Sequence, residues 1–239
     1  MTISLKAVIF DLDDTLYAER DYVLSGFRAV AGWADKNMSI PADLGFAELQ
    51  DLFAAGARND TFDRWLNRRR LFSKKLVAEL VDVYRAHDPA LVPFPEVSGV
   101  LSSLADRYRL GLLSDGHLKV QRRKLRALGL GAHFESIVFS DEWGRSAWKP
   151  SSLPFEILLE HLGLSGPQAI YVADNPGKDF LGARRVGMST VRFVSPEGIY
   201  AHLTPPSPAH APDLEIHDLR DLPRLLTGRL THRTETLCP

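Results

Sequence analysis

In the stretch Ala7-Val-Ile-Phe-Asp-Leu-Asp-Asp-Thr15, a short apolar run leads directly into a group of carboxylates. The run from Lys6 to Phe10 has the length and composition of a buried β-strand. Segments with helical periodicity separate it from further runs of the same kind, which lie at residues 109–113, 136–139, 169–172 and 190–194. Because strand and helix alternate and the strands are apolar on both faces, the sequence predicts an α/β fold with a doubly wound parallel sheet.

Residues 17–93 interrupt this alternation, since they show amphipathic helical patterns and no convincing strand. Ser73 is expected to cap one of these helices, and the prolines of residues 92–95 stiffen the return of the chain. Residues 214–216 are a candidate edge strand, and residues 218–226 a last helix. The expected organisation is an α/β core of residues 1–16 and 94–228, an inserted all-helical domain of residues 17–93, and a disordered tail of residues 229–239.

The composition excludes several classes of protein. The chain is 45% hydrophobic and carries 29 Lys+Arg against 30 Asp+Glu, so a disordered chain or a basic nucleic-acid binder is not indicated. No apolar run approaches the roughly 18 residues of a membrane span, and no secretory signal pattern is visible. The one cysteine, Cys238, cannot form an internal disulfide, which suits a reducing compartment. We expect a cytoplasmic protein without nucleic-acid or membrane partners.

Three of the predicted strands end at polar residues that chemistry can use. The first leads into Asp11–Thr15, the second into Ser114-Asp115-Gly116, and the fourth into Asp174, with Asp179 five residues later. Ligands of open parallel sheets bind outside the carboxyl ends of the strands, so these groups should converge. Clustered carboxylates repel one another unless a cation lies among them, and oxygen ligands with a substrate phosphate favour Mg²⁺. Taken singly, such Asp-rich turns also cap helices.

These residues resemble the four motifs of the haloacid dehalogenase superfamily, in the family's order and spacing. The motifs are Asp11-Leu-Asp-Asp-Thr15, Ser114, Lys149-Pro150 and Asp174-Asn-Pro-Gly-Lys-Asp179, within a match from Val8 to about Leu226. The helical insertion resembles the C1 type of cap domain in the phosphatases of that family. The resemblance implies a Rossmann-like catalytic core and a cap that covers the substrate.

The resemblance also implies a role for each motif residue. Asp11 would attack phosphorus and form an aspartyl-phosphate, and Asp13 would protonate the leaving oxygen and later deprotonate water. Ser114 would donate its hydroxyl to the phosphate, and Lys149 would offset the developing negative charge.

The implied metal and substrate contacts involve the same region. Mg²⁺ would be held by Asp11, the main-chain carbonyl of Asp13 and Asp174, with Asp179 acting nearby or through water. Besides Ser114 and Lys149, the substrate-binding residues would include Thr15 and Asp115, the latter through its amide. Two positions depart from the family pattern: Asp115 replaces the common Asn, which adds a carboxylate near the anion site, and Ala173 replaces the common Gly.

Some charged and aromatic residues outside the four motifs are assigned to the surface or to the edge of the substrate site. The basic run Arg122-Arg-Lys124 is interpreted as a solvated helix face. Tyr17 and Arg20 are expected at the near edge of the cap, where they would contact the substrate. His117 adjoins the second motif and is a weaker candidate for substrate contact.

The expected function is a Mg²⁺-dependent phosphatase that acts on a small phosphorylated metabolite, as a monoester, through an aspartyl-phosphate. A phosphomutase shares every core residue and stays an alternative, as does a non-catalytic phospholigand-binding regulatory protein. The dehalogenase branch needs no acid/base at the position of Asp13, so that residue argues against C–Cl hydrolysis. A phosphonate hydrolase would use a cap lysine, and none stands out. Both a monomer and a homodimer are compatible with the sequence.

Overall fold

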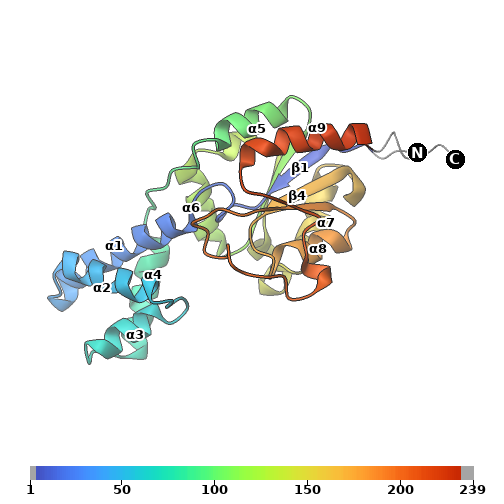
Figure 1. Ribbon diagram of the computed structural model, residues 1–239. Coiled ribbons are helices and arrows are strands. Elements are labelled where there is room, and N and C mark those ends of the chain that lie inside the picture. The colour runs from blue at the N-terminus through green and yellow to red at the C-terminus, as the bar shows by residue number, and fades with distance from the viewer. Residues whose placement is uncertain (1–3, 233–239) are drawn as a thin grey trace. The chain divides into compact units, whose positions relative to one another are not determined.

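The computed structural model describes residues 4–232 and divides into two compact units (Figure 1). The core unit comprises the residues before Arg20 and after Leu91, and the helical unit is Arg20–Leu91. The inserted domain expected at residues 17–93 is thus a few residues shorter at each end in the structure.

The core unit contains one six-stranded sheet in which every neighbouring pair of strands is parallel. The strands follow the order β3-β2-β1-β4-β5-β6. Their bounds are β1 Ala7–Phe10, β2 Arg109–Ser114, β3 Ser136–Phe139, β4 Ala169–Ala173, β5 Ser189–Phe193 and β6 Leu214–Ile216. Each predicted strand is present within a residue or so, and the candidate edge strand is confirmed as β6. The α/β prediction is therefore confirmed.

Helices cover both faces of the sheet, with α5 and α9 on one side and α7 and α8 on the other (Figure 1). The α-helices of the core unit are α5 Val97–Ala105, α6 Leu118–Leu128, α7 Leu153–His161, α8 Asp179–Arg185 and α9 Leu222–His232. Short 3₁₀ helices occupy Gly131–His133, Ser140–Trp143, Arg145–Ala147, Gly166–Gln168, Pro208–His210 and Leu219–Asp221. The last helix extends beyond its predicted end at Leu226, so the tail expected from residue 229 begins inside α9. Residues 233–239, with Cys238, lie outside the described residues.

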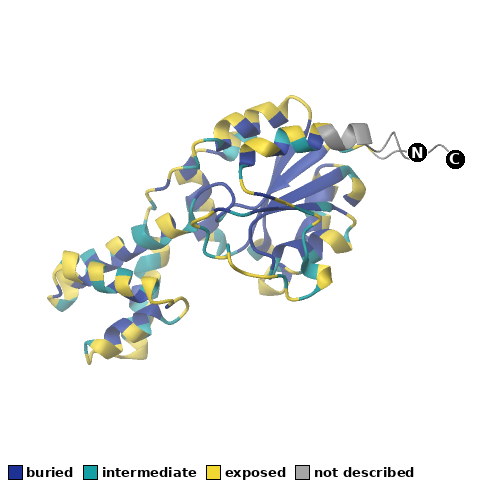
Figure 2. Cartoon of the chain, in the orientation of Figure 1, coloured by how far each residue is buried: buried dark blue, intermediate teal, exposed yellow. Residues whose placement is uncertain are grey.

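Packing on the α7/α8 face follows the two-residue period of the strands. Ala7 and Ile9 of β1, together with Tyr171 of β4, are buried against Phe155 of α7 and Phe180 of α8. Figure 2 shows the strands of the core unit in the buried class, whereas the outer faces of its helices are exposed. A sheet buried on both faces holds its strand ends rigidly, and the site described below lies at the carboxyl ends of these strands.

The helical unit has its own apolar core. Its helices are α1 Glu19–Met38, which begins at the last residue of the core unit's first segment, α2 Ala42–Ala54, α3 Thr61–Arg68 and α4 Lys74–Ala86. Phe27, Leu49 and Trp65 are buried between them. The predicted cap at Ser73 is confirmed, because its hydroxyl accepts the Leu76 N–H at 3.1 Å.

Among the helices within residues 4–232, none combines the length and the apolar character that crossing a bilayer requires.

Candidate active site

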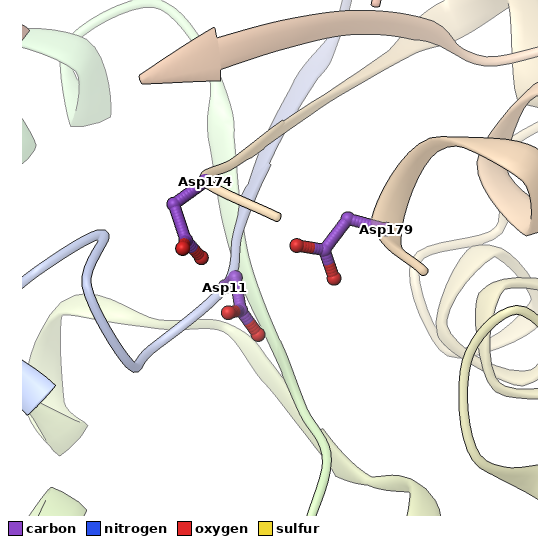
Figure 3. A group of neighbouring side chains, drawn as sticks. All are labelled: Asp11, Asp174 and Asp179. Atoms are coloured by element: carbon purple, nitrogen blue, oxygen red, sulfur yellow. The ribbon is translucent and has the colours of Figure 1, made fainter. Parts of the chain in front are cut away.

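Three aspartates meet at the carboxyl ends of two neighbouring strands. Asp11 follows β1, Asp174 follows β4, and Asp179 is the first residue of α8. β1 and β4 are parallel neighbours, so their carboxyl ends lie side by side. All three side chains are buried, and one oxygen of each lies within 4.8 Å of the others (Figure 3). The convergence expected at the carboxyl ends of the strands is therefore present for these three carboxylates.

Lys149 is the counter-charge within this cluster. Its Nζ lies 2.7 Å from Asp11 Oδ1 and 2.7 Å from Asp179 Oδ1, and it donates to the Tyr171 hydroxyl at 2.9 Å. The side chain is 0% exposed. Burial alone would lower the pKa of the ammonium, but the facing carboxylates of Asp11 and Asp179 raise it well above its usual value. Lys149 is therefore a fixed positive charge beside Asp11.

The charges of Lys149 and the more distant Lys178 do not balance three buried carboxylates. Burial, with a smaller contribution from Asp179, raises the pKa of Asp11 to about 6, even though Lys149 opposes the shift. Burial and the charges of Asp179 and Asp11 raise the pKa of Asp174 well above its ordinary range. Asp174 Oδ2 is buried, and the described part of the chain offers it no hydrogen-bond partner. This donor set of oxygen atoms with surplus negative charge fits a hard divalent cation such as Mg²⁺.

The hydroxyls of the first two motifs are also buried at the strand ends. Within residues 4–232, neither Ser114 Oγ nor Thr15 Oγ1 has a hydrogen-bond partner. A buried hydroxyl without a partner is unfavourable in the free protein, and an incoming acceptor would satisfy it. Both hydroxyls are therefore available to a ligand oxygen.

Asp115, which replaces the Asn common in the family, supports the loop that carries Lys149 (the Lys149 loop). Its carboxylate accepts the Lys149 backbone N–H, at 3.2 Å to Oδ1 and 3.1 Å to Oδ2, and the Ser140 hydroxyl at 2.6 Å. Lys178 Nζ lies 3.8 Å from Asp115 Oδ2. The carboxylate is thus bound and partly neutralised, which offsets the repulsion that an additional negative charge would exert on an anionic ligand.

The Asp13 carboxylate accepts hydrogen bonds from side chains outside the cluster of Asp11, Asp174 and Asp179. Lys124 Nζ donates to its Oδ1 at 2.7 Å, Gln121 Nε2 donates to its Oδ2 at 3.2 Å, and the Tyr17 hydroxyl donates to Oδ1. Burial acts to raise the pKa of Asp13, but the Lys124 ammonium, the Tyr17 hydroxyl and the charge of Lys178 together outweigh it, so that the pKa lies below its usual value. The carboxylate is 17% exposed, which leaves it accessible from one side.

The structure contradicts two interpretations of the sequence. Arg122 lies on the expected solvated face, where it is exposed and pairs with Glu142, but the Lys124 side chain is only 4% exposed. Tyr17 was placed at the edge of the cap, but it belongs to the core unit and is fully buried. The physical reason is the same for both residues: each packs inward to reach the Asp13 carboxylate.

Arg20 and His117 are the other two residues that the sequence suggested for substrate contact. Arg20 is exposed and is the first residue of the helical unit. His117 precedes α6, and its ring contacts Trp148 edge-to-face at 6.0 Å between centroids.

Several site residues were missed in the sequence, among them Lys124, Gln121 and Tyr171. One signal was present for the first two. Gln121 and Lys124 lie four residues before Leu125 and Leu128, which marks the same face of α6 as buried. A lysine on an apolar stripe needs a partner of opposite charge. Tyr171 gave no comparable signal, because a strand tyrosine is ordinary core composition.

Helix α8 lies close to the Lys149 loop at Gly182, so a larger residue at that position is expected to destabilise the protein. A Cβ at Gly182 would lie 2.6 Å from the Ser151 carbonyl oxygen and 2.7 Å from the Phe155 ring. Gly182→Ala is therefore expected to destabilise the protein by about 1–3 kcal/mol through overpacking, despite alanine's better helix propensity of roughly 1 kcal/mol. Thermal unfolding of the variant measures the effect.

Gly99 in α5 is the matched control, because a Cβ there would meet nothing within 4 Å. Gly99→Ala is expected to stabilise the protein by up to about 1 kcal/mol. Equal shifts in melting temperature for the two variants would contradict the close approach at Gly182.

Comparison with known proteins agrees with this geometry. Residues 8–193 match the model of the family described as haloacid dehalogenase-like hydrolase. The chain is 34% identical over 230 residues to the glyceraldehyde 3-phosphate phosphatase of Methanopyrus kandleri, covering 91% of this chain and 95% of that protein. It is 32% identical over 200 residues to the enzyme of the same name from Methanothermobacter thermautotrophicus, covering 78% and 84% of the two chains.

A solved structure shows the same fold. The HAD hydrolase candidate YfnB from Bacillus subtilis, bound to magnesium, superposes with a TM-score of 0.69 at 20% identity, over 93% of this chain and 99% of that chain. The family model spans most of the sequence, and the aspartates of the first and fourth motifs lie together at the strand ends. The chain belongs to the haloacid dehalogenase-like hydrolase family.

Proposed function

We propose that this protein is a Mg²⁺-dependent phosphatase that hydrolyses a small phosphate monoester through an aspartyl-phosphate on Asp11. Its relatives named as phosphatases, at about a third identity over most of the chain, make it a phosphoric monoester hydrolase. The observation that carries the mechanism is the buried contact of 2.7 Å between Lys149 Nζ and Asp11 Oδ1 within the acidic cluster. It places a fixed positive charge beside the proposed nucleophile.

In the first step, an oxygen of Asp11 attacks phosphorus and the bond from phosphorus to the ester oxygen breaks. In the substrate complex the negative charge of the phosphate favours the protonated form of Asp13, which gives its proton to the departing oxygen, so that an alcohol leaves. Lys149 holds the attacking carboxylate and offsets negative charge on the phosphoryl oxygens. The hydroxyls of Ser114 and Thr15, both without partners within the described part of the chain, donate to those oxygens.

In the second step, water attacks the phosphorus of the aspartyl-phosphate. Asp13, now ionised, takes a proton from this water, and the bond between phosphorus and the Asp11 oxygen breaks. Phosphate leaves and the carboxylate of Asp11 is restored. Splitting the reaction in this way replaces one difficult displacement by two easier ones.

Mg²⁺ fits the cluster formed by Asp11, Asp174 and Asp179, and the main-chain carbonyl of Asp13 is the further ligand that we propose. When bound, the ion supplies positive charge that makes a phosphate dianion and a carboxylate nucleophile compatible at close range. Asp174, whose Oδ2 is buried without a partner among the described residues, is the member of the cluster with the greatest need for this charge.

The two units have separate tasks in this proposal. The core unit, which lies before Arg20 and after Leu91, is the catalytic core, and the helical unit Arg20–Leu91 is the cap that selects the substrate and excludes water. The names of the two archaeal relatives favour a short phosphorylated aldehyde or alcohol as the substrate. Tyr17 acts in the core through Asp13, so substrate selection falls to residues of the helical unit.

Release of inorganic phosphate tests the proposal. The purified protein is expected to release phosphate from glyceraldehyde 3-phosphate, glycerol 3-phosphate or 4-nitrophenyl phosphate with Mg²⁺, and not with EDTA. Chloroacetate is included, and we expect no chloride release. Isomerisation of a sugar phosphate without net phosphate release would identify a mutase instead. Binding of phosphorylated ligands without turnover of any of them would identify a regulatory protein.

A further inference from the structure

We infer that Lys124, together with Gln121, is a positioning residue that fixes the Asp13 carboxylate for proton transfer to and from the ester oxygen. The inference rests on the proposed phosphatase function. It assigns a task in the reaction to helix α6, whose residues lie outside the four sequence motifs.

The contacts define the orientation of the carboxylate. Lys124 Nζ lies 2.7 Å from Asp13 Oδ1, and Gln121 Nε2 lies 3.2 Å from Asp13 Oδ2. Both oxygens are thus held from one helix, by side chains three residues apart on its buried face. With the Tyr17 hydroxyl also on Oδ1, rotation of the carboxylate would break several hydrogen bonds at once.

Gln121 also connects Asp13 to the second motif. Its Nε2 donates to the Asp115 carbonyl oxygen at 2.6 Å as well as to Asp13. Gly116, with a φ of +119°, permits this approach, because a Cβ at that position would lie 2.5 Å from Gln121 Nε2. The turn that carries Ser114 and the loop that carries Asp13 are therefore held in one frame. A phosphoryl group bound by Ser114 would meet Asp13 at a set position.

Stability alone is a weak reason for this arrangement. The desolvation cost of burying a lysine and an aspartate offsets most of their attraction, so such a pair adds little net stability. What the pair does supply is a fixed direction for the side chain. Proton transfer depends strongly on that direction, since a small misplacement of a catalytic group costs orders of magnitude in rate.

Lys124→Met tests the inference with two substrates that differ in leaving group. Glycerol 3-phosphate releases an alkoxide that needs a proton, whereas 4-nitrophenyl phosphate releases a stable phenolate that does not. We expect kcat/KM to fall on the order of 10²-fold for the alkyl ester and only a few-fold for the aryl ester. Because kcat/KM covers only the steps up to the first irreversible one, the later hydrolysis does not obscure the comparison.

Two further variants complete the test. Arg126→Met removes a charge from the exposed side of the same helix and is expected to leave both kcat/KM values unchanged. Asp13→Asn combined with Lys124→Met is expected to be no slower than Asp13→Asn alone, because Lys124 acts through Asp13. Circular dichroism checks that each variant is folded.

Two results would overturn the inference alone: equal losses for the alkyl and aryl esters, or a further loss in the Asp13→Asn background. Failure of the unmodified protein to release phosphate from either ester with Mg²⁺ would overturn the proposed function and this inference with it.

Discussion

Asp11→Asn is expected to abolish Mg²⁺-dependent phosphate release, with a fall in kcat of roughly 10⁴-fold or more, as is usual when a covalent nucleophile is lost. The amide has almost the same shape as the carboxylate but no negative charge, and it cannot form an acyl phosphate. Lys149, at 2.7 Å from Asp11 Oδ1, would keep its contact with Asp179, so the site is expected to stay folded. Phosphate release from 4-nitrophenyl phosphate measures the loss.

Asp106→Asn is the matched control, because Asp106 is exposed at the end of α5 and the substitution is chemically identical. It is expected to retain full activity. Mass spectrometry after acid quenching should detect a phosphoryl adduct on the unmodified protein and none on the Asp11→Asn variant. Undiminished turnover by that variant would rule out Asp11 as the nucleophile.

The sheet and the acidic cluster were predictable because they depend on local patterns and on one rule of topology. Each strand is a short apolar run, and parallel strands present their carboxyl ends at one edge of the sheet. Asp11 and Asp174 follow two such runs, so their proximity required no knowledge of other contacts. The strand pattern itself did not indicate which side chains would neutralise them, because ion pairing depends on distances that the pattern leaves open; only the family resemblance implied Lys149 beside Asp11.

Lys124 illustrates this limit. It contacts Asp13 across 111 positions of the sequence, and no local pattern specifies such a pairing. The basic run around it was interpreted as solvated, since most lysines are. The helical period placed Lys124 on the same stripe as Leu128, which was reason to expect burial and a buried partner. Asp115 is a second example, because its carboxylate accepts the backbone N–H of Lys149, 34 positions later, and no local pattern specifies that contact either.

Mg²⁺ is expected to raise the melting temperature of the unmodified protein, and Asp174→Asn is expected to remove most of that increase. Asp174 is buried, its pKa is raised well above the ordinary range by burial and by Asp179 and Asp11, and its Oδ2 has no partner among the described residues. A cation bound at about 100 times its dissociation constant stabilises the folded state by about 2.7 kcal/mol. For a chain of this size, that corresponds to roughly 5–10 °C.

The same substitution is expected to raise the melting temperature in EDTA, because burying the Asp174 carboxyl group beside Asp179 and Asp11 costs folding free energy that the neutral amide does not incur. The predicted effects thus have opposite signs with and without the ion, which a general loss of structure would not produce. NaCl at equal ionic strength separates specific binding from screening, and Asp106→Asn should respond to Mg²⁺ as the unmodified protein does. An unchanged Mg²⁺ response in Asp174→Asn would show that the ion binds elsewhere, and would remove Asp174 from the proposed metal site.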